Sequence, residues 1–240
     1  MLNESTIERI RELGLTGLLS AIEEQNSKPE LYRDLSFEER LGLIIDREFG
    51  QRQERKMTRR MKEADFKYPN AAIENIRFKA SRGFSKQDIL TLAENNWIKQ
   101  SKNLIITGAT GTGKSYLACA LGTRACLSNM PVLYYRTPKL FDVIHGARLR
   151  NEYSALIKKI KRASLVIIDD FAHTVLSEPE QKDILEVVEE RYGVGSIVVT
   201  SQLPIEKWHA AMPNPTLADA ILDRLIQKAE KLNPKGETQR

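Results

Sequence analysis

A glycine-rich loop between an apolar run and a helix-like segment constrains the fold of this chain more than any other feature. Residues 104–121 read LIITGATGTGKSYLACAL, in which glycine, lysine and serine have the spacing G-x-x-x-x-G-K-S. In such a loop the backbone N–H groups converge on phosphate oxygens, and the amino terminus of the next helix adds positive charge. We therefore predict a binding loop for a nucleoside triphosphate, formed by Gly108, Ala109, Thr110, Gly111, Thr112, Gly113, Lys114 and Ser115.

Side chains of this loop and a pair of carboxylates further along the chain predict the chemistry of the site. Lys114 is expected to contact the β- and γ-phosphates, and Ser115 to ligate Mg²⁺. Residues 165–170, LVIIDD, read as a buried parallel strand that ends in adjacent carboxylates. Asp169 is predicted to hold Mg²⁺ through water, and Asp170 to polarise an attacking water molecule. This pair favours hydrolysis of the nucleotide over its storage.

Composition and charge limit the classes of protein to which the chain can belong. A length of 240 residues, of which 41% are hydrophobic, suffices for one α/β domain and a small additional domain. The charged fraction of 29% and the lack of an apolar run of ~18 residues exclude an integral membrane protein. The N-terminus is unlike a secretory signal and only Cys119 and Cys126 occur, so a cytoplasmic location is expected. A net charge of +5 mildly favours a polyanionic partner.

Residues 1–68 are predicted to form a helical N-terminal domain that binds DNA or a protein partner. Ser36 begins a capping-box pattern before a helix whose expected apolar face is formed by Leu41, Ile44, Ile45 and Phe49. The continuation of this helix, residues 51–62, is strongly basic. A solvated helix face is one interpretation of that charge. Its nearly unrelieved sign favours contacts with a DNA phosphate backbone, made by Arg52, Arg55, Lys56, Arg59 and Arg60.

Residues 69–240 are predicted to form the nucleotide-binding domain. After a helix from Ser85 to about Trp97, strands are expected at 103–107, 131–136, 165–169, 196–200 and 230–233, with a helix over 115–128. Alternating strands and helices imply an α/β fold with a parallel sheet covered on both faces and the nucleotide at the carboxyl ends of the strands. A basic helical insertion interrupts the alternation at about residues 138–162. Its expected DNA contacts are Arg148, Arg150, Lys158, Lys159 and Lys161.

The chain resembles the IstB family, the ATPase helper subunits of IS21-type transposition systems. The likeness extends over nearly the whole chain and is carried by residues 82–122, by LVIIDDF at 165–171, by TSQLPIEKWH at 200–209 and by PTLADAILDRL at 215–225. It implies an AAA+ P-loop parallel-sheet ATPase domain that uses ATP and Mg²⁺ and is related to DnaC-like helicase loaders. It also implies a DNA-binding regulator of transposition that forms a homo-oligomer on double-stranded DNA and engages a transposase. From the composition, no membrane partner is expected.

The resemblance also implies roles for individual residues. Gln202 stands at the position of the polar sensor residue of AAA+ proteins, where asparagine is commoner, and the basic insertion resembles the initiator-type helix of replication initiators. Arg224 matches the arginine finger that reaches the γ-phosphate bound by a neighbouring subunit. The few residues after Arg224 lead us to expect no full lid domain, so that a neighbour must close the site. Asp170 replaces the usual catalytic glutamate, which predicts slow hydrolysis.

Two other functions share parts of this pattern. A helicase loader that grips a hexameric helicase through its N-terminal helices would share every residue of the nucleotide site. The basic N-terminal helix and the lack of a cysteine-based zinc site favour transposition instead. A small-molecule kinase would require acceptor-binding arginines in a lid and would need neither Arg224 nor the basic insertion.

Overall fold

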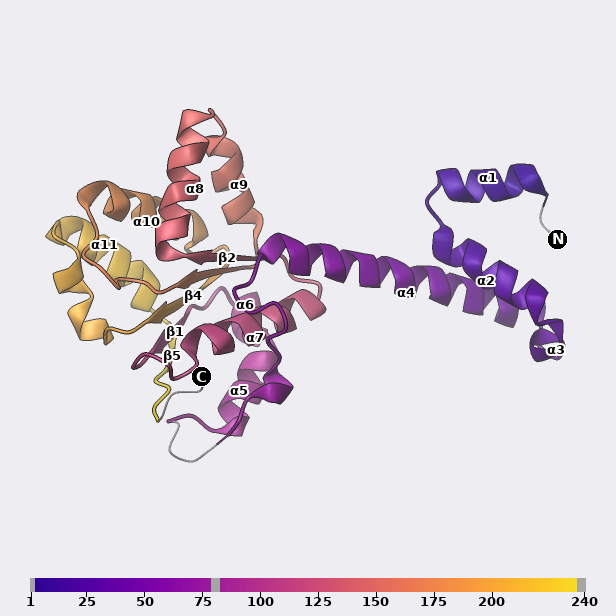
Figure 1. The fold of residues 1–240 in the computed structure, drawn as a ribbon, viewed down its shortest axis with the longest axis horizontal. Helices are drawn as coiled ribbons and strands as arrows, with labels where there is room; N and C mark the ends of the chain where they lie inside the picture. Colours follow the sequence, from indigo (N-terminus) through magenta and orange to yellow (C-terminus); the bar gives the residue numbers. More distant parts are fainter. Residues whose placement is uncertain (1–2, 79–82, 237–240) are drawn as a thin grey trace. The chain divides into compact units, whose positions relative to one another are not determined.

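The computed structural model describes residues 3–78 and 83–236, and its contacts divide the chain into two compact units (Figure 1). The first unit ends at Arg59 and the second begins at Arg60. This division falls inside helix α4 (Phe37–Ala64), whereas the sequence predicted a boundary after residue 68. The last turn of the basic helix therefore packs with the nucleotide-binding unit.

The N-terminal unit is helical, as expected. It contains α1 (Glu4–Glu12), α2 (Thr16–Ser27), α3 (Pro29–Tyr32) and the first part of α4. Ser36 and Glu39 form the predicted capping box at the start of α4, with each side chain accepting a hydrogen bond from the other residue's backbone N–H. Glu48 of α4 in turn accepts from the backbone N–H of Leu18 at 3.0 Å and so caps α2.

The predicted apolar face of α4 is wrong in detail. Gly17 of α2 lies so close to α4 that a Cβ there would be 2.9 Å from the Cα of Glu48. This close crossing buries Glu48, whereas Ile45 and Phe49 are 53% and 61% exposed. Of the expected apolar positions only Ile44 is half-buried. The apolar pattern predicts the wrong buried side of α4. The Glu48 carboxylate can be buried because it accepts a hydrogen bond from the backbone of α2, which it caps.

The second unit is built on a five-stranded parallel sheet with strand order β2-β3-β4-β1-β5 (Figure 1). All the strands predicted from the sequence are present, with ends that differ by at most one residue. They are β1 (Leu104–Thr107), β2 (Val132–Arg136), β3 (Leu165–Asp169), β4 (Ser196–Ser201) and β5 (Glu230–Leu232). Because the strands are parallel, the residues after β1, β3 and β4 meet at one edge of the sheet.

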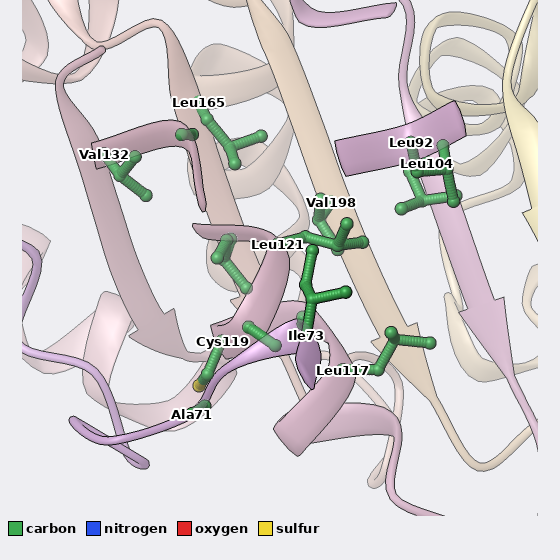
Figure 2. Close-up of a cluster of buried hydrophobic side chains, with 14 of the residues drawn as sticks. Ala71, Ile73, Leu92, Leu104, Leu117, Cys119, Leu121, Val132, Leu165 and Val198 are labelled. Atoms are coloured by element: carbon green, nitrogen blue, oxygen red, sulfur yellow. The ribbon is translucent and has the colours of Figure 1, made fainter. Parts of the chain in front are cut away.

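Helices cover both faces of the sheet, which explains the continuous apolar strands. On one face lie α7 (Lys114–Leu127), α5 (Lys86–Ala93), α6 (Asn96–Lys99) and η1 (Ile73–Asn75). Figure 2 shows this core, with Leu121 of α7 beside Val198 of β4 and Leu92 of α5 beside Leu104 of β1. On the other face lie α8 (Thr137–Leu149), α9 (Tyr153–Arg162), α10 (Glu178–Arg191) and α11 (Pro215–Ile226). Short turns η3 (Ile205–Lys207) and η4 (His209–Ala211) precede α11.

Two helical predictions meet different outcomes. The single helix expected from Ser85 to Trp97 is wrong, because Asn95 adopts a left-handed conformation (φ 61°) that separates α5 from α6. The segment expected to form the helical insertion contains two helices, α8 and α9, joined by a turn at Asn151. Across the described ranges, no helix has the length and apolarity that a bilayer span requires.

Candidate nucleotide-binding site

The glycine-rich loop connects β1 to α7, as predicted. Gly111 and Gly113 have φ values of 84° and 88°, a conformation that glycine adopts without strain. A Cβ on Gly108 would come within 2.5 Å of the carbonyl oxygen of Pro234. Glycines are therefore required for the path of this loop, and α7 begins directly behind it with its amino terminus toward the loop.

Lys114, the first residue of α7, extends over the loop. Its Nζ donates hydrogen bonds to the carbonyl oxygens of Gly108 and Ala109 at 2.7 and 2.8 Å. Burial lowers the pKa of Lys114, and the nearby carboxylates of Asp170 and Asp169 oppose that shift. Additional negative charge in the loop, such as that of a triphosphate, would favour the charged form of this lysine.

Asp169, at the end of β3, is fully buried among hydroxyl groups. Its Oδ1 accepts hydrogen bonds from Ser115 at 2.8 Å and from Thr200 at 2.5 Å, and its Oδ2 accepts one from Tyr134 at 2.6 Å. Burial and the adjacent Asp169 both raise the pKa of Tyr134, which keeps this phenol a hydrogen-bond donor. The fold thus brings together Ser115 and Asp169, the two residues predicted for the metal.

The donor set of this pair suits Mg²⁺. The Ser115 hydroxyl and the Asp169 carboxylate are hard oxygen ligands, and such a site usually leaves further positions for water and phosphate. Ser115 and Asp169 would hold the ion, which would supply positive charge to the phosphates when bound.

Asp170 lies immediately outside the strand in a left-handed conformation (φ 59°), and its backbone N–H donates to the Thr200 hydroxyl at 3.1 Å. This turn separates its side chain from that of Asp169. The Asp170 carboxylate instead accepts hydrogen bonds from Arg136, at 3.0 Å from Nη2 and 3.2 Å from Nε. The predicted water-activating group therefore has a cationic partner at the end of β2.

Gln202 follows β4 and contacts the phosphate-binding loop. Its Oε1 accepts a hydrogen bond of 2.7 Å from the Thr110 hydroxyl. The fold therefore places this residue beside the loop.

Arg224 lies away from this site, near the carboxyl end of α11. Its backbone oxygen accepts from the side chain of Asn103, which precedes β1, whereas the loop with Lys114 follows β1. The four residues of β1 separate the two ends by ~13 Å, which exceeds the reach of an arginine side chain. The Arg224 guanidinium is paired with Glu189 of α10 at 3.0 Å.

A cavity of about 460 Å³ lies at this opposite edge of the sheet. None of its lining residues is acidic. Five of them are cationic, namely Lys99, Lys102, Arg191, Arg224 and Lys228. Arg191 is buried and donates to the carbonyl oxygens of Ile160, Ala163, Ser164 and Ser196, so it joins the end of α9 to the starts of β3 and β4. Burial lowers the pKa of Arg191 to about 10.

Most of the predicted DNA-binding side chains of α4 have partners within the protein. Arg52 pairs with Glu48 at 2.6 Å. Arg55 donates to Thr16 and Gln51, and Arg60 donates to Asn129. Arg59 also has a partner within the protein, whereas Lys56 is exposed and has no ion pair within the described ranges.

The basic insertion also contains both cations that are paired within the protein and cations that are not. Arg148 pairs with Asp183 at 2.6 Å, Arg150 with Glu152 at 2.7 Å, and Lys161 with Glu190 at 2.8 Å. Lys158 and Lys159 are exposed on α9, and no ion pair with either is found in the part of the chain that the structure describes.

Sequence reasoning missed three residues that organise the site. Thr200 bonds both Asp169 and the backbone of Asp170, Tyr134 bonds Asp169, and Arg136 bonds Asp170. Tyr134 and Arg136 are polar residues two positions apart on the predicted strand 131–136, and Thr200 stands two residues before Gln202. Their polarity in these strands was the available signal.

Comparisons with known proteins find relatives over nearly the whole chain. The model of the IstB-like ATP binding protein family matches residues 8–240. An insertion sequence ATP-binding protein of Sinorhizobium fredii is 39% identical over 100% of this chain and 97% of its own length. The ATP-binding protein of insertion sequence IS1162 from Pseudomonas fluorescens is 36% identical over 90% of this chain and 93% of its own.

Solved structures of low sequence identity share the fold. The DnaC helicase loader superposes with a TM-score of 0.62 at 17% identity, over 70% of this chain and 98% of its own. The replication initiator DnaA bound to AMPPCP and single-stranded DNA gives a TM-score of 0.62 at 18% identity, over 72% of this chain and 52% of its own. These matches show that the second unit has the fold of an AAA+ P-loop ATPase domain.

Proposed function

The chain belongs to the family of IstB-like ATP-binding proteins, and from this premise we propose that it is a DNA-dependent AAA+ ATPase that regulates DNA transposition. It assembles on double-stranded target DNA as a homo-oligomer and engages a transposase. The observation that carries the proposal is the hydrogen bond between Ser115 and Asp169, because it assembles a metal-binding pair beside the phosphate-binding loop.

Each residue of the nucleotide site has a proposed role. Lys114 and the loop amides bind the phosphates, and Ser115 and Asp169 hold Mg²⁺. Asp170 accepts a proton from the attacking water, and Gln202 helps to orient that water. Two features of Asp170 support slow hydrolysis: its ion pair with Arg136, and a side chain shorter than that of the usual glutamate.

Completion of the site requires a second copy of the chain. Arg224 is too far from its own loop, so it is proposed to act on the triphosphate bound by a neighbour. The loop and Arg224 lie at opposite ends of the strands. A contact between the loop of one copy and Arg224 of another therefore joins two different surfaces, which is a heterologous interface. Such head-to-tail contacts build rings or helical filaments.

DNA binding is proposed to use backbone phosphates rather than base edges. The exposed lysines Lys56, Lys158 and Lys159 are the best candidates, since no ion pair occupies them in the described structure. Arg52, Arg55, Arg59, Arg60, Arg148, Arg150 and Lys161 contribute positive charge, but each must exchange a protein partner for a phosphate. Contacts of this type are independent of sequence and sensitive to salt.

The relatives support the choice of a transposase as the protein partner. They are described as ATP-binding proteins of insertion sequences, whereas the likeness to the DnaC helicase loader is one of fold at 17% identity. A helicase loader therefore remains the alternative that shares the nucleotide site, and the family favours transposition.

The ATPase rate with and without double-stranded DNA, with electron microscopy of the same mixtures, tests the proposal. We expect slow turnover alone, faster turnover with DNA, and ordered protein assemblies on the duplex only when ATP is present. Turnover that does not respond to DNA, with no assembly on it, would contradict the proposed function.

A further inference from the structure

A second lysine faces the buried carboxylate of the nucleotide site. Lys67 lies in the segment between α4 and η1, and its Nζ is 3.8 Å from Oδ2 of Asp169. The Asp169 side chain is 0% exposed, and that of Lys67 is 35% exposed. A buried carboxylate is strongly unfavourable without a compensating charge, so Lys67 has an electrostatic role at this site.

The backbone on both sides of Lys67 is anchored on the nucleotide-binding unit. Phe66 is buried and meets the Tyr134 ring edge-on, with 6.3 Å between ring centroids. The Tyr68 ring packs against the Tyr116 ring of α7, with 5.8 Å between the ring centroids. These contacts fix the segment beside Asp169, so the direction of the Lys67 side chain follows from the packing of its neighbours.

Lys67 is held at this site by fewer direct contacts than Lys114. Lys114 is held by two carbonyl hydrogen bonds, whereas Lys67 approaches Asp169 at an ion-pair distance with no hydrogen bond between them. In the same position its ammonium lies over the Tyr68 ring, 5.6 Å from the ring centroid, which is a cation–π contact.

A divalent cation and a lysine ammonium at the same carboxylate repel each other. Asp169 with Ser115 has the oxygen donors that suit Mg²⁺, and Lys67 already faces that carboxylate. The two positive groups therefore compete for Asp169.

We propose that Lys67 is a tethered counter-ion that neutralises Asp169 until a divalent cation binds with the nucleotide, and that its displacement sets the Mg²⁺ concentration the site requires. Lys67 keeps the hydroxyl network around Asp169 assembled in the metal-free protein. Its competition weakens the binding of Mg²⁺ alone, so the metal is retained together with the negative charge of the phosphates. The inference rests on the proposed function, because it presumes that the site binds ATP with Mg²⁺.

The test is a Mg²⁺ titration of the full chain with a fluorescent ATP analogue at fixed concentration. Because a charge within ~4–6 Å shifts an ionisation by one to three pKa units, we expect Lys67→Met to lower the Mg²⁺ midpoint by about tenfold. Lys67→Arg keeps the charge and should retain a midpoint near that of the wild type. Lys62→Met, which removes an exposed lysine of α4, controls for net charge and should leave the midpoint unchanged.

An unchanged or raised midpoint in Lys67→Met would overturn the inference, including the case in which only the melting temperature falls. If Lys67→Met does not fold, Lys67→Gln replaces it in the same titration with the same expected shift. Failure of the wild type to bind the analogue at any Mg²⁺ concentration would contradict the proposed function itself, which separates the two failures.

Discussion

The guanidinium of Arg136 lies 3.0 Å from the carboxylate of Asp170, across the ends of two neighbouring parallel strands. Asp170 is the group proposed to activate water, and this contact occupies one of its oxygens. Arg136 is 55% exposed, so the pair is weak enough to separate when the site changes its partners.

Arg136→Ala is therefore expected to raise basal ATP hydrolysis. An exposed ion pair is worth ~0.2–1 kcal/mol, so the gain should be at most about fivefold, with unchanged nucleotide affinity. Arg162→Ala, which removes an exposed arginine at the end of α9, is the matched control. Steady-state turnover without DNA measures the effect, and a rate below that of the wild type would show that Arg136 assists the reaction.

Asp170→Asn should keep ATP binding and slow turnover. The Ser115 and Asp169 pair survives this change, whereas general-base assistance, typically worth ~10²–10⁴-fold, does not. Fluorescent-ATP titration and single-turnover hydrolysis separate the two effects. Wild-type hydrolysis in this variant would remove Asp170 from the mechanism.

Arg224→Ala should bind ATP nearly normally and hydrolyse it poorly on DNA. Mixing it with Lys114→Ala protein should restore part of the activity, because some interfaces then join an intact loop to an intact arginine. No rescue is expected where oligomers do not form. If Arg224→Ala turns over ATP at the wild-type rate, Lys228 in the same cavity becomes the next candidate. Arg191 is not a candidate, because its guanidinium is held by carbonyl groups inside the unit.

The salt dependence of DNA binding should distinguish free from paired cations. Replacing both Lys158 and Lys159 by alanine should lower the slope of log K against log salt by about two units, one for each lost phosphate contact. Lys161→Ala should have a smaller effect, since this lysine is already paired with Glu190. Fluorescence anisotropy at several salt concentrations provides the slopes. An unaltered slope in the double variant would move the DNA contacts to another part of the chain.

The sheet and the phosphate-binding loop could be predicted from the sequence because their signals are local. Apolar runs define the strands, and the spacing of Gly108, Gly113 and Lys114 defines the loop. The partners of the carboxylates could not be predicted. Arg136 and Thr200 reach Asp170 and its backbone through the strand order β2-β3-β4, which local periodicity does not specify.

Surface charge was the least predictable property. The sequence shows how many cations α4 and α9 carry, but not that Arg52 and Lys161 meet carboxylates of the protein. Glu48 illustrates the same limit in the N-terminal unit, where a capping interaction buries a residue that composition assigns to the surface.

The most direct test of the central claim, that ATP bound at this loop drives assembly on DNA, is analytical ultracentrifugation with a double-stranded DNA of random sequence. Wild-type protein should form large DNA-bound species with ATP and Mg²⁺ but not without nucleotide. Lys114→Ala should remain small under both conditions, because the phosphates lose their cationic partner. Equal assembly of the two proteins, or assembly that does not depend on ATP, would contradict the claim.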